Sequence, residues 1–261
     1  MSGVVIAFSG KGGSGKTTLA ALVLRHLVRS GVKPILAVDA DPNATLGLTL
    51  GVPVEETIAD LRDRMGEAAA KVREIPKERL MDQWLAEVLS EETGFDLLTM
   101  GRPEGPKCYC YVNGLLRRYL KELRGNYAAV VVDCEAGMEY LSRLTVDDVD
   151  SLVLVAEATS VALTSARRIA QLADALPVHV KRRVLAVNKV GQPGLAEAPA
   201  KAPDIPGLSA VVRVPFDEDL YRRCAQGIAL DGEAGTAARP AIESLARLCL
   251  AERHQGVQTR D

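Results

Sequence analysis

The segment Gly10–Thr18 reads GKGGSGKTT and stands between two apolar patterns, and it is the most informative part of the sequence for the fold. The run Val4–Phe8 (VVIAF) before it predicts a short buried strand, and the leucine spacing of Leu19–Arg29 after it predicts an amphipathic helix. Glycine has no Cβ, so a loop with four glycines can curl tightly between them. A strand, a glycine-rich loop and a helix in this order form a phosphate-binding loop.

The side chains of this loop fit a nucleoside triphosphate. Backbone N–H groups of such a loop point at phosphate oxygens, and the helix N-terminus adds a partial positive charge. The position of Lys16 lets it reach the β and γ phosphates, and the hydroxyl of Thr17 is placed for Mg²⁺. We therefore expect ATP or GTP to bind. The predicted phosphate contacts are Gly10, Lys11, Gly12, Gly13, Ser14, Gly15, Lys16, Thr17 and Thr18.

Composition limits the class of protein. The chain has 261 residues, of which 48% are hydrophobic and 25% are charged, which suits one α/β domain over residues 1–252 with a polar tail at 253–261. A net charge of −2 and the absence of a lysine or arginine run argue against nucleic acid as a partner. There is no signal peptide and no apolar stretch of membrane-spanning length, so we expect a cytoplasmic protein without a membrane partner. Five cysteines, an odd number, argue for reduced thiols.

Short apolar runs alternate with amphipathic segments along the chain. Runs that are hydrophobic throughout are typical of strands buried on both faces, so they predict a doubly wound, mostly parallel sheet with helices on both sides. The helices are expected at Leu19–Arg29, Gly114–Leu123 and Leu163–Leu176, and residues 54–92 are expected to form an insertion. The strands are expected at Val4–Phe8, Ile35–Val38, Leu97–Met100, Ala128–Val132, Leu152–Val155, Val184–Val187 and Val211–Val214.

Carboxylates follow two of these runs. Asp133 ends the run VVV, the form of a Walker B strand that holds Mg²⁺, and Gly137 after it can present a backbone N–H to the γ phosphate. Asp39 and Asp41 follow the second predicted strand, where two carboxylates suit a metal ion and a water molecule.

Two cysteines, Cys108 and Cys110, are separated by one residue. If the backbone is extended, both sulfurs lie on one side, and a two-fold symmetric dimer would then supply the four thiolates of a tetrahedral site. Zinc, nickel or copper(I) could use such a site. Two small buried apolar residues explain the same spacing equally well, so the spacing by itself leaves both interpretations open.

The segments Lys11–Gly13 and Gly15–Thr17 resemble the deviant phosphate loop of the MinD, ParA and nitrogenase iron-protein superfamily. The resemblance implies ATPase activity and a homodimer in which Lys11 crosses to the nucleotide of the other subunit. It implies catalytic roles for Lys11, Lys16 and Asp41, with Asp41 orienting the attacking water. It further implies a metal or lysine contact for Asp39 and contacts to the adenine base from Asn188, Pro215 and Phe216.

The combination of this loop with residues 39–42, 108–110 and 133–143 resembles the CooC-type accessory ATPases, which insert nickel into carbon monoxide dehydrogenase. The resemblance implies a metallochaperone with that client enzyme and Ni²⁺ or Zn²⁺ shared between subunits by Cys108 and Cys110. An ATP-gated iron–sulfur electron-transfer protein, similar to the nitrogenase iron protein, is the main alternative. Cys134 is expected to be a structural residue unless it lies near the dimer interface, and Cys224 and Cys249, which lie in helical patterns, are expected to be core residues.

Overall fold

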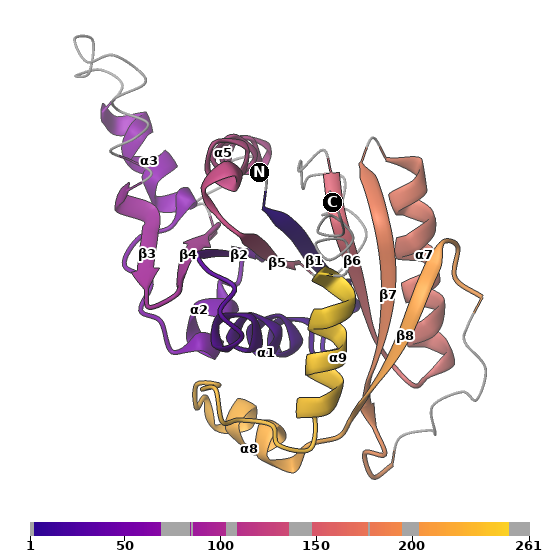
Figure 1. Cartoon of the computed structure of the whole chain (residues 1–261). Helices are drawn as coiled ribbons and strands as arrows, with labels where there is room; N and C mark the ends of the chain where they lie inside the picture. Colours follow the sequence, from indigo (N-terminus) through magenta and orange to yellow (C-terminus); the bar gives the residue numbers. More distant parts are fainter. Residues whose placement is uncertain are drawn as a thin grey trace, which may run out of the picture.

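The computed structural model describes residues 3–68, 84, 86–102, 109–135, 148–176, 178–194 and 204–250. Within these residues one sheet of eight strands runs through the molecule (Figure 1). Its strands are β1 (Val4–Gly10), β2 (Ile35–Ala40), β3 (Leu89–Glu92), β4 (Phe95–Thr99), β5 (Ala129–Cys134), β6 (Asp148–Glu157), β7 (His179–Val190) and β8 (Leu208–Pro215).

The strand order is β3-β4-β2-β5-β1-β6-β7-β8, and every neighbouring pair is parallel except β3 with β4. β1 therefore lies in the middle, between β5 and β6, and the loop that follows it opens at the carboxyl edge of the sheet. Ligands of parallel α/β sheets bind at this edge, where the strand order reverses. The predicted doubly wound fold is confirmed.

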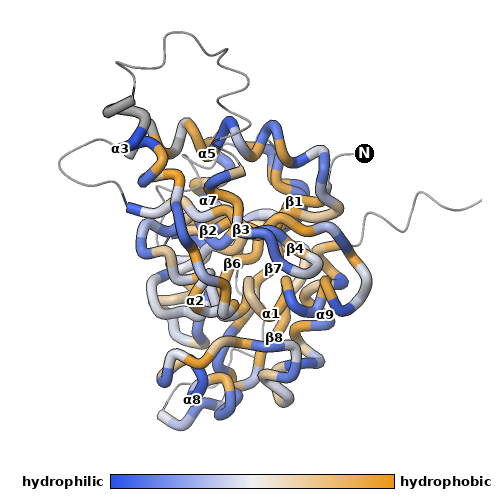
Figure 2. The backbone as a smooth tube through the Cα atoms, turned by 90° about the vertical axis from the view of Figure 1, so that its left-hand side faces the viewer, coloured by the Kyte–Doolittle hydropathy of each residue, from blue (hydrophilic) through white to orange (hydrophobic). Residues whose placement is uncertain are grey.

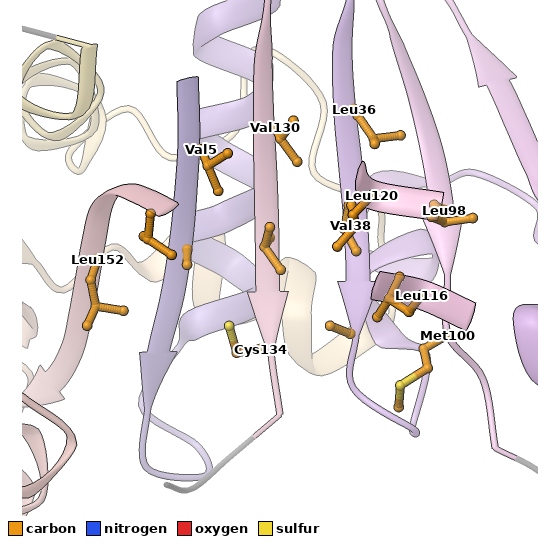
Figure 3. Close-up of a cluster of buried hydrophobic side chains, with 14 of the residues drawn as sticks. Val5, Leu36, Val38, Leu98, Met100, Leu116, Leu120, Val130, Cys134 and Leu152 are labelled. Atoms are coloured by element: carbon orange, nitrogen blue, oxygen red, sulfur yellow. The ribbon is translucent and has the colours of Figure 1, made fainter. Parts of the chain in front are cut away.

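Helices cover both faces of the sheet (Figures 1 and 2). One apolar layer joins the sheet to α1, α2, α8 and α9, and the other joins it to α3, α5 and α7. Figure 3 shows part of the second layer, in which Leu116 and Leu120 of α5 lie over β2 and β4. The bounds are α1 (Lys16–Arg29), α2 (Thr45–Leu50), α3 (Ile58–Ala68), α5 (Tyr109–Leu123), α7 (Ser160–Ala175), α8 (Glu218–Gln226) and α9 (Arg239–Leu250), with a 3₁₀ turn at Arg124–Asn126.

All seven predicted strands and all three predicted helices are present, with shifted ends. The strand β3 was not predicted, because its sequence LSEE carries three polar residues and its last two are exposed at the edge of the sheet. β3 comes from the predicted insertion at 54–92 and pairs antiparallel with β4, so the end of this segment belongs to the sheet.

The structure bears on the condition set for the cysteine pair, that the backbone be extended. The helix α5 begins at Tyr109, so the backbone at Cys110 is helical, and the extended geometry considered for Cys108 and Cys110 does not hold there. The apolar positions of this segment recur at helical spacing, which buries Val112, Leu116 and Tyr119 against the sheet. Cys108 itself lies outside the described residues.

Candidate nucleotide site

The loop between β1 and α1 depends on its glycines. Gly13 and Gly15 adopt left-handed backbone conformations with φ of +77° and +94°, and Gly15 is the N-cap of α1. A Cβ on Gly10 would lie 2.2 Å from the carbonyl oxygen of Val155, because β1 runs close beside β6. The three glycines thus allow the loop to curl tightly before α1. A loop of this shape presents its backbone N–H groups at the helix N-terminus, which is the geometry of an anion-binding site.

The first turn of α1 presents the two side chains predicted for phosphate and metal. Lys16 is buried, and its Nζ lies 3.4 Å from the carbonyl oxygen of Lys11. The Thr17 hydroxyl donates a hydrogen bond of 2.6 Å to Oδ2 of Asp133, at the end of β5. The loop and the predicted Walker B carboxylate, far apart in the sequence, are therefore in direct contact.

A second carboxylate lies beside Asp133. The strands β2 and β5 pair so that Asp39 stands opposite Asp133, and both residues are almost completely buried. Burial and the neighbouring Asp133 charge raise the pKa of Asp39 to about 7. Burial likewise raises the pKa of Asp133 to about 6, although the Thr17 hydrogen bond and the Lys16 charge oppose this. Two buried carboxyl groups with raised pKa values form a site that a cation would stabilise in its ionised form.

The donor set fits Mg²⁺. Oδ1 of Asp133 is buried and has no hydrogen-bond partner among the described residues, while Oδ2 accepts from Thr17. Carboxylate and hydroxyl oxygens are ligands that Mg²⁺ prefers, together with water and phosphate oxygens. Both Asp39 oxygens accept backbone hydrogen bonds, from Asp41 at 3.1 Å and from Leu46 at 2.7 Å. Asp39 therefore orders the following loop, and Asp133 keeps an oxygen available for metal.

Asp41 lies in that loop and is half-buried. Its Oδ1 accepts from the backbone N–H of Asn43 at 2.9 Å and from the Asn43 amide at 2.8 Å, so its carboxylate is oriented by a local turn. The Asp41 charge also raises the pKa of both Asp39 and Asp133. Asp41 is thus near the two buried carboxylates, as its predicted role requires, and this role stays a prediction.

A pocket of about 350 Å³ adjoins the loop. Asn188, Pro215 and Phe216, the residues predicted to contact the base, all line it. The other lining residues come from the loop with α1 and from the chain between β7 and α8: Gly13, Gly15, Lys16, Thr17, Thr18, Leu19, Lys189, Val214, Asp217, Leu220, Tyr221 and Cys224. The α8 residues were not predicted, since a helix pattern does not show what the exposed face of the helix borders. Lys189 was not predicted, since a strand pattern gives no sign that its backbone turns left-handed.

The cysteines divide into two kinds. Cys134 and Cys249 are buried, as expected, and burial raises the pKa of both thiols, that of Cys249 to about 12. Figure 3 shows Cys134 at the end of β5 among core side chains. The expectation for Cys224 is wrong, because this thiol is exposed on α8. Its Sγ lies 3.7 Å from the Thr18 hydroxyl, because Cys224 stands one turn after Leu220 on the face of α8 that lines the pocket.

Several predicted site residues are not tested by the geometry. Gly137 and Cys108 lie outside the described residues, and only the backbone of Cys110 is described. Lys11 is exposed on the loop surface. Among the described residues there is no group of three or more His, Cys, Asp or Glu side chains that could hold a metal ion. None of the helices in the described part of the chain has both the length and the apolar character of a membrane-spanning segment.

Comparison with known families identifies a match over most of the chain. Residues 5–230 match the sequence model of the CbiA family, the CobQ/CobB/MinD/ParA nucleotide binding domain. An uncharacterised ATP-binding protein of Methanocaldococcus jannaschii is 38% identical over 231 residues, which cover 87% of this chain and 90% of that protein.

Two further similarities bear on the fold and on the function. The carbon monoxide dehydrogenase accessory protein CooC of Rhodospirillum rubrum is 32% identical over 200 residues, which cover 72% of this chain and 75% of that protein. The structure of the septum site-determining protein MinD of Pyrococcus horikoshii, complexed with Mg-ADP, superposes with a TM-score of 0.70. The superposition covers 99% of this chain and 100% of the MinD chain. Because the two sequences are only 21% identical, this similarity shows the fold alone.

Proposed function

Because this chain belongs to the CobQ/CobB/MinD/ParA family of nucleotide-binding domains, we propose that it binds ATP with Mg²⁺ and hydrolyses it. The observation that carries the proposal is the 2.6 Å contact between Thr17 of the loop and Asp133 of β5. This contact holds the Thr17 hydroxyl and the Asp133 carboxylate together near the N-terminus of α1, and these are the two groups that would hold a phosphate-bound Mg²⁺. The adjoining pocket of about 350 Å³ provides room for the nucleoside.

Each residue has a separate task in this proposal. The loop N–H groups and Lys16 hold the phosphates, and Thr17 and Asp133 hold the metal. A bound Mg²⁺ supplies positive charge that stabilises the developing negative charge on the phosphates. Asp41 orients the attacking water, and Lys11 approaches the phosphates of a second copy of the chain. Gly137 contacts the γ phosphate through its backbone N–H and so distinguishes ATP from ADP.

The orientation of the Asn188 side chain favours adenine over guanine as the base of the bound nucleotide. Its Nδ2 donates a 2.8 Å hydrogen bond to the carbonyl oxygen of Ser14, so its other amide atom, an oxygen, is the end that can meet a base. An oxygen accepts from the exocyclic amino group of adenine, whereas guanine presents an acceptor at the same ring position. Pro215 and Phe216 then pack against the base from the end of β8.

Nucleotide titrations and phosphate-release assays test this proposal. We expect Lys16→Ala to weaken MgATP binding roughly 10- to 100-fold, because it removes a charged hydrogen-bond donor. Asp41→Asn should bind MgATP with nearly unchanged affinity but lower kcat by about 100-fold or more. A wild-type chain that binds neither MgATP nor MgADP would refute the proposal.

The finer part of the proposal is that this ATPase is a maturation factor that assists nickel insertion into carbon monoxide dehydrogenase. It is supported by the 32% identity to CooC and by the pair Cys108 and Cys110. Nickel is here the cargo, held by four thiolates from two copies of the chain. The helix α5, which begins directly after Cys108, leads along the chain to the strand β5, which carries Asp133, so nucleotide state and metal binding can be coupled.

Metal content distinguishes this role from electron transfer. Wild-type protein incubated with Ni²⁺ or Zn²⁺ should hold one ion per dimer, and the double variant Cys108→Ser/Cys110→Ser should hold none. The iron–sulfur alternative instead predicts a brown protein after anaerobic purification, with a visible absorption that bleaches on reduction. Tight metal binding by the double variant would count against both roles for this pair.

A further inference from the structure

Two consecutive residues of β7 reach the same stretch of the phosphate loop. Nδ2 of Asn188 donates to the carbonyl oxygen of Ser14 at 2.8 Å, and Nζ of Lys189 donates to the carbonyl oxygen of Gly13 at 2.9 Å. Consecutive side chains of a regular strand point to opposite faces of the sheet, so a regular β7 could not make both contacts. The contacts therefore require a local departure from strand geometry.

The backbone of Lys189 supplies that departure. Its φ is +57°, a left-handed conformation that is unfavourable for a residue with a Cβ, and the β7–β8 register shifts between Val187 and Val190. Such strain persists only where surrounding contacts hold it, and it is concentrated at functional sites. At Lys189 the strained backbone turns the side chain to the side on which Asn188 already faces the loop.

Lys189 is also held from a second strand. Its Nζ forms a 2.7 Å ion pair with Oε1 of Glu157, the last residue of β6, which stands opposite Asn188 in the β6–β7 register. Both side chains are about 30% exposed, with 31% for Lys189 and 28% for Glu157. The Glu157–Lys189 pair thus joins the carboxyl ends of β6 and β7 to the loop that follows β1.

The held atoms are carbonyl oxygens, which matters for binding an anion. A phosphate is attracted by backbone N–H groups and repelled by backbone carbonyls. The peptide after Gly13 can rotate easily because glycine tolerates many conformations, and such a rotation would turn its carbonyl toward the phosphates. A bond from Lys189 to this carbonyl holds it on the β7 side of the loop.

We propose that Lys189, held by Glu157, is a positioning residue that keeps the Gly13 carbonyl turned away from the phosphates, so that the loop is formed before nucleotide arrives. This inference rests on the proposed nucleotide binding. Preorganisation lowers the cost of binding without adding a contact to the ligand. Lys189 therefore acts through Gly13 and sets nucleotide affinity more than the rate of the chemical step.

The test measures the Kd of MgADP by calorimetry on the full chain, together with KM and kcat for MgATP. We expect Lys189→Met to raise the Kd and KM about tenfold and to change kcat by less than about threefold. Lys189→Arg should recover most of the affinity, since its guanidinium can donate to both partners. Equal MgADP affinity in Lys189→Met and wild type would overturn the inference.

Lys181→Met is a matched control. Lys181 also lies on β7 and pairs at 2.7 Å with a β6 carboxylate, that of Asp150, but at the opposite end of the two strands. We expect its nucleotide affinity to equal that of wild type. A loss as large as that of Lys189→Met would show that any β6–β7 ion pair matters, and would overturn the specific role.

The variant Glu157→Gln distinguishes two roles of Lys189, that of a positioning residue and that of a simple positive charge near the phosphates. If Lys189 acted only as a positive charge near the phosphates, removing the Glu157 carboxylate would strengthen nucleotide binding. If Glu157 holds Lys189 on Gly13, its loss weakens binding. Weaker binding supports the inference, and tighter binding overturns it.

The variant Lys189→Gly shows whether weaker binding by Lys189→Met comes from a loss of stability. Glycine accepts the left-handed backbone, so this variant should be at least as stable as Lys189→Met while it lacks the donor. We expect a similar loss of affinity with an undiminished Tm, and wild-type affinity would overturn the inference. Failure of the wild-type chain to bind MgADP would refute the proposed function, whereas normal binding by Lys189→Met and Lys189→Gly would refute only this inference.

Discussion

Gly15 shows how one missing side chain permits both the loop and its support. Its φ is +94°, and a Cβ there would lie 2.3 Å from Nδ2 of Asn188, the atom that holds Ser14. Substitution therefore meets two obstacles, the backbone strain and a collision with a side chain that has its own partner. The position requires glycine for reasons that come from two different parts of the chain.

We expect Gly15→Ala to lower the free energy of unfolding by about 2 kcal/mol or more and to weaken MgADP binding. Gly31→Ala is the control, because Gly31 has a φ of +80° and a Cβ added there would meet no atom within 4 Å. The control should lose only about 1–2 kcal/mol from backbone strain, with normal MgADP binding. Urea denaturation and calorimetry measure both quantities, and equal effects of the two substitutions would contradict the steric argument.

Asp39 makes stability depend on pH in an unusual direction. Its pKa in the folded chain is about 7 against an ordinary value of 3.8, so between these values the folded state holds a proton that the unfolded state has released. The free energy of unfolding should then fall as pH rises through this window, by up to about 1.4 kcal/mol per pH unit. Asp39→Asn has no carboxyl proton to release, so the free energy of unfolding of this variant should change less with pH than that of wild type.

Urea denaturation at pH 5 and pH 8, without nucleotide and with a chelator present, measures this difference. Adding Mg²⁺ should raise the free energy of unfolding at pH 8 more than at pH 5, since a cation favours the ionised carboxylates. Identical slopes for wild type and Asp39→Asn would show that the Asp39 carboxyl is not buried in the way the structure places it.

At the scale of elements, α8 is fixed by one buried carboxylate. Asp217 caps this helix by accepting from Leu220 N at 3.1 Å, and its other oxygen accepts from Ala237 N at 2.8 Å and from Ala238 N at 3.2 Å. The same residue thereby ties the pocket wall formed by α8 to the start of α9. The position of Tyr221 and Cys224 at the pocket depends on this tie.

Asp217→Ala should lower the free energy of unfolding by about 3 kcal/mol, because it leaves several backbone donors without an acceptor. Thr159→Ala is a matched cap substitution, since Thr159 caps α7 with a single bond from Ala162 N at 3.2 Å. It should cost about 1 kcal/mol. Only Asp217→Ala should also weaken MgADP binding, and an equal effect of both variants on affinity would argue against the role of α8 in the pocket.

At the scale of the whole molecule, the proposed function needs two copies of the chain. Lys11 is exposed at the loop surface, so it is accessible to a second molecule. Light scattering should show a dimer with Mg²⁺ and a nonhydrolysable ATP analogue and a monomer with ADP. Lys11→Ala should bind MgATP normally, remain monomeric and lose about 1000-fold in kcat, the range known for charges supplied in trans. A fully active Lys11→Ala monomer would exclude the role in trans.

Hydrophobic periodicity and motif spacing were enough to predict most of the strands and helices and to propose where a nucleotide would bind. Seven strands were predictable because residues buried on both faces of a sheet must be apolar throughout, as in Val130–Val132. The loop was predictable because few arrangements of glycine, lysine and threonine fit a phosphate. The edge strand β3 was not, since exposure on one side removes the apolar signal that buried strands carry.

Which distant residues meet depends on the strand order and could not be predicted from the sequence. Asp39 and Asp133 share a site because β2 and β5 are neighbours in the sheet, although their sequence separation gives no sign of it. Asn188 lies 174 residues from Ser14, and Lys189 joins it only because its backbone turns left-handed. Cys224 looked like a core residue and lines the pocket instead. Local periodicity reports whether a residue is buried, whereas strand order and single backbone angles determine its neighbours.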